Sequence, residues 1–183
     1  MFRFIIVTLV LIGCSINLSS QTYVTETAGP ETKAEREERR INYLLSEINA
    51  LRTRGCKCGR KRMAKVAPLT WNDKLEYSAY LHAKEMNDYN YFGHRSRSGE
   101  DVGDRVDKIG YKWRNVGENL AVGQTDFKEA LKDWLESDSH CRMIMDPKMS
   151  EMGLAKVGRY WVHHFGTLMP PKTKRVSTIY REG

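Results

Sequence analysis

Residues 68–92, "PLTWNDKLEYSAYLHAKEMNDYNYF", carry the clearest helical pattern of the chain. Apolar residues that recur every three or four positions form one face of an α-helix. Here they are Leu75, Ala79, Ala83 and Met86. Thr70 or Asn72 can cap the amino end, because a short polar side chain there accepts hydrogen bonds from free backbone amides. His82 lies on the apolar face, where a histidine is more often a hydrogen-bonded core residue than a ligand. We therefore expect an amphipathic helix that packs against a core.

A second helix is expected before this one. Its apolar face repeats from residue 41 onward and consists of Ile41, Leu44, Leu45, Ile48 and Leu51. Gly55 ends it. Residues 21–40 finish in "ETKAEREERR", which alternates charges without an apolar stripe, so we expect a charged linker there.

The remainder of the chain mixes helices and strands. Residues 102–109 predict a short helix, and "GYKW" (110–113) suits a strand. Asp126 starts another helix with Glu129 placed for a capping box, and that helix ends at Ser137. Residues 137–147 read as a loop that includes about one turn of helix, and 152–166 as an antiparallel hairpin turning near Gly158. With 183 residues, 40% hydrophobic and 29% charged, the chain has material for one globular domain.

The first 20 residues have the features of an export signal. Arg3 precedes an apolar stretch from Phe4 to Ile12, which is followed by small and polar residues up to Ser20. "LIGC" (11–14) also resembles a bacterial lipobox, in which Cys14 is lipidated and becomes the new amino terminus. The competing cleavage follows Ser20. A membrane-spanning helix needs about 20 apolar residues, and no other stretch comes close. We expect an exported protein that is secreted, periplasmic or lipid-anchored at the cell envelope.

Three cysteines follow the signal, at positions 56, 58 and 141. Disulfides persist outside the cytoplasm, so Cys141 is expected to pair with Cys56 or Cys58 and to leave the other free. Closing a loop of that size contributes about 4 to 5 kcal/mol in the chain-entropy model. Alternatively, the Cys-x-Cys pair and Cys141 bind zinc, although no fourth ligand stands at a standard spacing.

The segment 52–65, "RTRGCKCGRKRMAK", carries seven positive side chains and no acid, which equals the formal net charge of +7. One interpretation is a solvated loop. The other is an electrostatic contact with anionic lipid headgroups or cell-envelope polymer. Nucleic acid is not expected as a partner, because the chain is exported and the segment has no aromatic residue to stack on bases.

Three polar groups stand beside turn signals and off the apolar stripes. His94 follows one helix end, Glu118 lies between two turn-prone residues, and His140 follows another helix end. Two neutral imidazoles and a carboxylate can hold a divalent ion such as zinc and leave a position open for water or ligand. The same trio could perform acid–base chemistry.

Five blocks of the sequence resemble the CAP superfamily (cysteine-rich secretory proteins, antigen 5 and pathogenesis-related 1), in its bacterial SCP-like branch. They are "LTWNDKLEYSAYLHAKEM" (69–86), "YFGHRSRSGEDVGDRVDKIGY" (91–111), "VGENLAVG" (116–123), "WLESDSHCRMIMDP" (134–147) and "YWVHHFG" (160–166). The resemblance places the domain at residues 41–168 and leaves 169–183 as a basic tail. It implies an α+β fold, a three-layer α-β-α sandwich with a small antiparallel sheet between helices.

The resemblance also implies a cleft lined by two histidines and two acids, with the histidines binding zinc or another divalent ion in some members. His94, Glu118 and His140 match three of these positions. The fourth position, where family members tend to have the second acid, is Ser137 in this chain. The acid Glu136 precedes it by one residue, which on a helix turns the side chain by about 100°. The neighbouring Asn119 is expected to hydrogen-bond the cleft loop.

Two further expectations concern residues close to that cleft. Arg105 is expected to pair with local acids rather than to touch a ligand. A disulfide at Cys141 would position the adjacent His140, because it would tether that loop to the segment after the first helix.

Three functions fit these features. The first, which we favour, is a non-catalytic exported module that binds a divalent metal and a small or lipidic ligand in the His/Glu-lined cleft or a neighbouring groove, since sterol and fatty-acid binding is reported for some family members. The second is a metal-dependent, peptidase-like hydrolase with Glu118 as base. It is weakened by the absence of a His-Glu-x-x-His helix. The third is an adhesive or structural envelope protein that uses residues 52–65.

Overall fold

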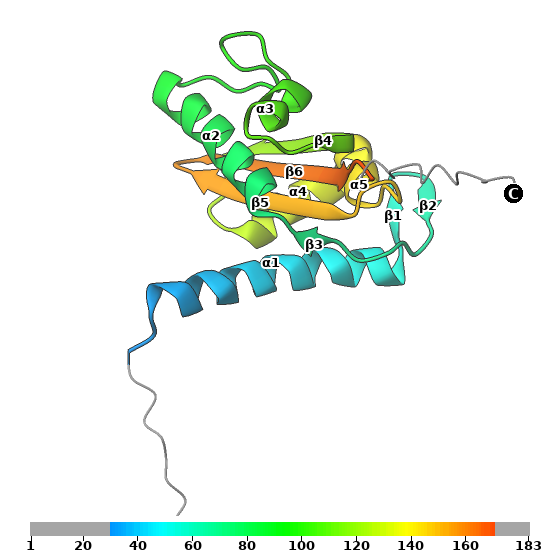
Figure 1. Cartoon of the computed structure of the whole chain (residues 1–183). Coiled ribbons are helices and arrows are strands. Elements are labelled where there is room, and N and C mark those ends of the chain that lie inside the picture. Colours follow the sequence, from blue (N-terminus) through cyan, green and yellow to red (C-terminus); the bar gives the residue numbers. More distant parts are fainter. Residues whose placement is uncertain (1–29, 171–183) are drawn as a thin grey trace, which may run out of the picture. The chain divides into compact units, whose positions relative to one another are not determined.

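The computed structural model describes residues 30–170, which form an α+β domain (Figure 1). The helices are α1 (Lys33–Arg54), α2 (Asp73–Tyr89), α3 (Val102–Lys108), α4 (Phe127–Glu136) and α5 (Asp138–Ile144). The strands are β1 (Cys56–Cys58), β2 (Lys61–Met63), β3 (Thr70–Trp71), β4 (Trp113–Val122), β5 (Glu151–Val157) and β6 (Tyr160–Leu168). The expected signal peptide with Cys14, the first part of the linker and the tail beyond residue 170 lie outside the described residues.

A four-stranded sheet in the order β3-β5-β6-β4 forms the middle layer. β6 pairs antiparallel with both β4 and β5, and the β5–β6 hairpin turns at Gly158 as predicted. The expected antiparallel sheet is formed by β4, β5 and β6, and at one edge the two-residue strand β3 adds a parallel pairing with β5. So short a strand has no alternation pattern that a sequence could show.

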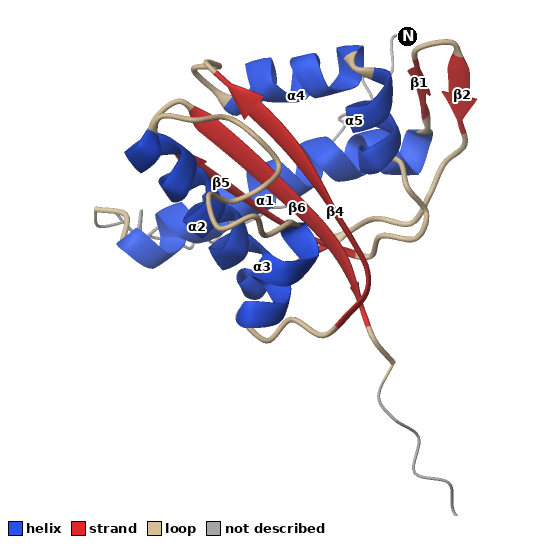
Figure 2. Ribbon diagram, turned by 90° about the horizontal axis from the view of Figure 1, so that it is seen from above, coloured by secondary structure: helices blue, strands red, loops and turns tan. Residues whose placement is uncertain are grey.

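Helices cover both faces of this sheet, so the expected three-layer sandwich is confirmed (Figures 1 and 2). Alternate residues of β6 point to opposite layers. Trp161 and Phe165 belong to the core that α1, α4 and α5 cover, whereas Tyr160 and Val162 belong to the core under α2. The neighbouring histidines of this strand, His163 and His164, consequently lie on opposite faces.

The predicted long helix is α2. Asn72 caps it by accepting hydrogen bonds from the backbone amides of residues 74 and 75. The predicted apolar stripe is fully buried. Gly153 of β5 permits the close approach of the helix, because a Cβ at this position would lie 2.0 Å from the backbone nitrogen of Glu76.

Four segments differ from the sequence-based expectations. The strand expected at 110–113 is instead β4 at Trp113–Val122, so Glu118 lies in mid-strand and not beside a turn. α1 begins at Lys33, so the final part of the expected linker is helical; an ion pair between Glu37 and Arg40 supports this charged part. Residues 138–144 form the helix α5 rather than a loop, and Ser137 alone separates it from α4. Residues 52–65 contain the antiparallel hairpin β1–β2.

No helix within residues 30–170 is both long enough and apolar enough to cross a membrane.

Candidate functional site

The site centres on Glu118, a buried carboxylate on β4. Glu118 lies directly opposite His164 in the β4–β6 ladder, so the two side chains share one face of the sheet. His164 Nε2 is 2.8 Å from Glu118 Oε2, and Arg105 of α3 donates to the same oxygen at 2.6 Å. The other oxygen, Oε1, is 2.7 Å from Nδ1 of His94. Both carboxylate oxygens are therefore occupied by protein groups.

These partners keep Glu118 ionised. Burial alone would raise the pKa of this carboxyl, but the hydrogen bonds from His164 and His94 and the charge of Arg105 hold the pKa well below its usual value. Only 3% of the Glu118 side chain is exposed. The carboxylate is thus a fixed negative charge that organises its neighbours.

Arg105 fixes the loop that carries His94. Besides Glu118, its guanidinium donates to the carbonyl of His94 at 3.0 Å, to Ser96 Oγ at 3.2 Å and to the carbonyl of Glu100 at 2.9 Å. One buried side chain therefore binds both the carboxylate and the backbone of the loop. This arrangement sets the position of His94 relative to β4.

His94 presents its ring to solvent from this anchored loop. Its side chain is 61% exposed, and the hydrogen bond that it donates to Glu118 raises the pKa of the imidazole above its ordinary value. Since Nδ1 is engaged by the carboxylate, Nε2 is the nitrogen left for a ligand, and it makes no hydrogen bond to the described residues. Histidines that bind metals usually have this carboxylate partner on the second nitrogen.

His140 lies on α5, which packs against β4 and α4. Asn119 of β4 donates from Nδ2 to the carbonyl of His140 at 3.0 Å and so connects α5 to the strand that carries Glu118. Burial, and then the charge of His94, lower the pKa of His140. The two imidazoles therefore lie close enough to interact electrostatically. With Glu118, however, they do not form a trio of donor atoms all within 4.8 Å of one another; in residues 30–170 only the three cysteines do.

The two candidates for the fourth cleft position have partners other than Glu118. The Glu136 side chain is 66% exposed and lies 3.8 Å from Lys132. The Ser137 hydroxyl lies 3.2 Å from the hydroxyl of Ser139.

Two histidines near Glu118 were not predicted as site residues. His164 is the direct partner described above, and Nε2 of His82 lies 3.9 Å from the carboxylate while it is bonded to the carbonyl of Gly93 at 2.9 Å. The hydrogen bond to Gly93 confirms the expectation that His82, on the apolar face of α2, is a hydrogen-bonded core residue. For His164 the available signal was its place in a strand that pairs with the Gly-Glu-Asn strand, but only the pairing register brings the two side chains together.

The disulfide partner of Cys141 is also decided. Cys58 and Cys141 form a disulfide, and Cys56 is free. The bond joins α5 to the hairpin that follows α1.

Comparison with known proteins identifies the family to which the chain belongs. Residues 45–165 match the model of the cysteine-rich secretory protein family (CAP), so the chain belongs to this family. Among curated proteins it is similar to the uncharacterized protein YkwD of Bacillus subtilis (strain 168), with 32% identity over 100 residues that cover 54% of this chain and 39% of that protein.

Two solved structures share the fold. One is an extracellular protein containing an SCP domain from Bacillus anthracis, with a TM-score of 0.62, 24% identity and coverage of 76% of this chain and 45% of that one. The other is an outer surface protein of Borrelia burgdorferi, with a TM-score of 0.62, 20% identity and coverage of 78% and 100%. The chain spans less than half the length of the Bacillus proteins.

Proposed function

We propose that this protein is an exported, non-catalytic binding module in which His94 and His140 hold a divalent cation such as zinc. The observation that carries the proposal is the 2.7 Å contact between Nδ1 of the exposed His94 and the buried Glu118. This contact fixes the ring and its tautomer and leaves Nε2 for the metal. The lowered pKa of His140 favours the neutral imidazole that a metal requires. Bound zinc would supply a positive charge and an open coordination position for a ligand.

Calorimetric titration with zinc tests this proposal. The wild-type chain should bind one ion, and the His94→Ala, His140→Ala double variant should lose the binding. Glu118→Gln should weaken binding by about 10- to 100-fold, as expected for the loss of a carboxylate partner of a ligating histidine. Glu136→Gln serves as the control and should bind like the wild type. Equal affinity of the wild type and the double variant would refute the histidine site.

The state of Glu118 favours a binding module over the alternative hydrolase. A general base needs a pKa near the operating pH and contact with the water that it activates. The pKa of Glu118 is well below its usual value, and His94, His164 and Arg105 occupy its two oxygens. The carboxylate therefore fits an orienting role for His94 better than the role of base.

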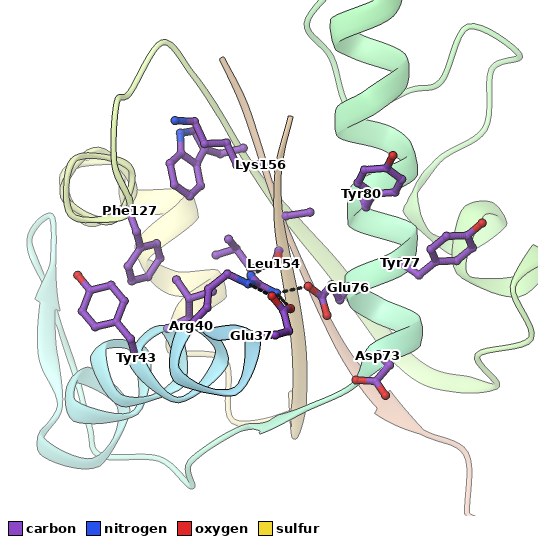
Figure 3. A pocket seen from close by; sticks show the side chains of 13 residues that line it. Glu37, Arg40, Tyr43, Asp73, Glu76, Tyr77, Tyr80, Phe127, Leu154 and Lys156 are labelled. Carbon is purple, nitrogen blue, oxygen red and sulfur yellow. Dashed lines mark hydrogen bonds and ion pairs between the residues drawn. The ribbon is translucent and has the colours of Figure 1, made fainter. Parts of the chain in front are cut away.

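The small or lipidic ligand fits a groove beside α1 and α2 (Figure 3). This groove has a volume of about 640 Å³, within the usual range for small-molecule sites. Aromatic side chains form much of its lining: Tyr43, Tyr77, Tyr80, Phe127 and Trp161. None of His94, Glu118 and His140 is among the lining residues, so we place the metal and the apolar ligand in different parts of the domain.

Displacement of a fluorescent fatty-acid analogue tests the groove. Tyr77 and Tyr80 stack on each other at its rim, with ring centroids 6.4 Å apart. Replacing both by alanine should weaken binding about tenfold, which corresponds to about 1.4 kcal/mol. Tyr89 is an equally exposed tyrosine of α2 outside the groove, so Tyr89→Ala is the matched control. Equal losses in both variants would argue against a ligand in the groove.

The hairpin β1–β2 favours a second candidate function, attachment to an anionic envelope surface. Of the seven cations in residues 52–65, Arg52 is buried and the other six are exposed. Sedimentation with vesicles that contain anionic lipid tests this function. Replacing Arg60, Lys61 and Arg62 by glutamate should abolish cosedimentation, and high salt should do the same to the wild type. Binding that resists both changes would exclude an electrostatic contact.

A further inference from the structure

The free thiol of Cys56 lies directly beside the disulfide. Cys56 and Cys58 alternate with Lys57 on the short strand β1, so their side chains share one face. The Cys56 sulfur is 3.9 Å from the sulfur of Cys58 and 3.8 Å from that of Cys141. Three sulfur atoms from β1 and α5 thus form one compact cluster, which the site around Glu118 does not use.

The position of this sulfur argues against thiol–disulfide exchange within the cluster. A thiolate displaces a sulfur by approaching along the line of the S–S bond, from beyond one of its ends. Cys56 is nearly equidistant from both bonded sulfurs, so it lies broadside to the bond. Exchange with the disulfide therefore does not account for the Cys56 thiol in this cluster.

The same distances fit a metal site. Zinc bonds thiolate sulfur at about 2.3 Å, which sets the edges of a regular tetrahedron of ligands at about 3.8 Å. The two separations from Cys56 already have this length. The third edge would join the sulfurs of Cys58 and Cys141, which are bonded to each other in the disulfide. Reduction would allow these two sulfurs to move apart from backbone positions whose Cα atoms are 5.5 Å apart.

The surroundings of the cluster suit a thiolate complex of this kind. Cys58 and Cys141 are fully buried, whereas Cys56 is half-buried and lines a pocket of about 620 Å³. The pocket is also lined by five cations: Arg54, Lys57, Arg60, Arg62 and Lys65. Zinc with three thiolates carries one net negative charge, which these cations stabilise. The pocket supplies an entry path and a place for water or an anion as fourth ligand.

We propose that Cys56, Cys58 and Cys141 form a zinc site when the disulfide is reduced. A dithiol reductant supplies two electrons and two protons to the Cys58–Cys141 bond and is itself oxidised to a disulfide. Zinc then displaces the protons of the three thiols as it binds to their sulfurs. The oxidised chain, which has a single free thiol in the cluster, does not hold the ion there. This site shares no ligand with the proposed His94–His140 site.

Cobalt titration of the full chain tests the proposal, because cobalt in a thiolate site has an intense sulfur-to-metal charge-transfer band. Cys14→Ser serves as the background in every sample, so that the three cysteines are the only thiols. After reduction with a phosphine, this chain should bind one cobalt ion with that band, and zinc should displace the cobalt. The oxidised chain should show no band. The His94→Ala, His140→Ala change should leave the band unaltered, which separates this site from the histidine site.

Cys56→Ser is the decisive variant, because it removes one sulfur and leaves the disulfide intact. In the reduced state Cys56→Ser should bind cobalt at least about tenfold more weakly than the parent chain. Loss of a residue that only hydrogen-bonds a metal ligand already weakens binding by about that factor, and Cys56 is itself a proposed ligand. Should reduction unfold the chain, zinc should restore the thermal transition of the parent chain but not that of Cys56→Ser. A reduced parent chain without the charge-transfer band, or one that responds to metal as Cys56→Ser does, would overturn the proposal.

Discussion

His163 and His164 are neighbours on β6, but their imidazoles meet opposite environments. His164 bonds Glu118, whereas the fully buried ring of His163 packs between Trp134 and Phe165. Neither ring nitrogen of His163 has a hydrogen-bond partner among the described residues. A buried polar group without a partner costs free energy, and an apolar group of similar size avoids this cost.

These environments predict opposite effects of the same substitution. His163→Leu should leave the free energy of unfolding unchanged or raise it by up to about 1 kcal/mol. His164→Leu should lower it by about 2 kcal/mol or more, because Glu118 loses a buried partner. Urea denaturation of the two variants measures both changes. A large loss of stability in His163→Leu would mean that its ring nitrogens have partners after all, such as buried water.

The buried histidines predict that the protein loses stability in acid. Burial lowers the pKa of His82 to about 4, and it also lowers the pKa values of His163 and His164. The unfolded chain takes up protons at these groups as the pH falls below about 6.5, while the folded chain does not. The free energy of unfolding is therefore highest above that pH and decreases as the pH falls below it. Glu118 adds a further loss below about pH 4.5, since its folded pKa is lowered.

His94 acts in the other direction. Its raised pKa stabilises the fold below about pH 6.5, and this contribution is lost as the pH rises through the folded pKa. Four histidines with a lowered pKa, His140 included, outweigh one with a raised pKa, so Tm should fall as the pH is lowered from about 7.5 to 4.5. Thermal unfolding followed by circular dichroism measures this, and the curve of His163→Leu should be shallower than that of the wild type. A Tm that is constant or rises in acid would contradict the neutral state assigned to the buried histidines.

At the scale of elements, the disulfide adds a covalent link to the packing and hydrogen bonds that attach α5 to the domain. This seven-residue helix is too short to be stable alone, and the Cys58–Cys141 bond fixes it to β1. His140 immediately precedes Cys141 on this helix. The bond therefore holds a proposed metal ligand in place.

Cys141→Ser should accordingly have two effects. The free energy of unfolding should fall by about 2 to 5 kcal/mol, and the affinity for zinc at His94 and His140 should fall as well. Denaturation and calorimetry of the same variant measure both. Cys56→Ser is the control, because it keeps the disulfide and should change neither value. Unchanged zinc affinity in Cys141→Ser would break the link between the bond and the histidine site.

Elements with a long periodic pattern were predictable, and short ones were not. α2, α4 and the β5–β6 hairpin follow from apolar spacing and turn residues, and Asn72 and Asp126 cap the two helices as expected. The capping box expected from Glu129 does not form, because its carboxylate accepts from the backbone amide of Thr125. α5, β3 and the hairpin β1–β2 are too short for any period to show, and tertiary contacts form them. His94 follows the end of α2 as expected, but the turn signal used for Glu118 was wrong, because this residue lies within the strand β4. His164 could not be selected from local signals, because its role depends on the register between strands.

At the scale of the whole molecule, Arg52 connects segments that lie far apart in the sequence. This arginine on α1 is fully buried. Its guanidinium donates to the carbonyls of Ala67 before β3, Ile144 at the end of α5, and Asp146 and Met149 in the loop to β5, at 2.6 to 3.1 Å. The basic segment 52–65 therefore contains one structural cation, which its composition did not reveal.

The planar geometry of the Arg52 contacts predicts that lysine cannot replace this arginine. A guanidinium has five N–H donors in a fixed plane and reaches four carbonyls at once, whereas an ammonium has three donors at a single point. Arg52→Lys should therefore lower the free energy of unfolding by about 3 kcal/mol, since buried carbonyls lose charge-assisted hydrogen bonds. Arg54→Lys, an exposed change two residues later on the same helix, should have almost no effect. Urea denaturation of the two variants measures the difference. Equal stabilities would show that the carbonyls of these segments do not depend on the guanidinium, and that the apolar core alone connects α1 to the sheet.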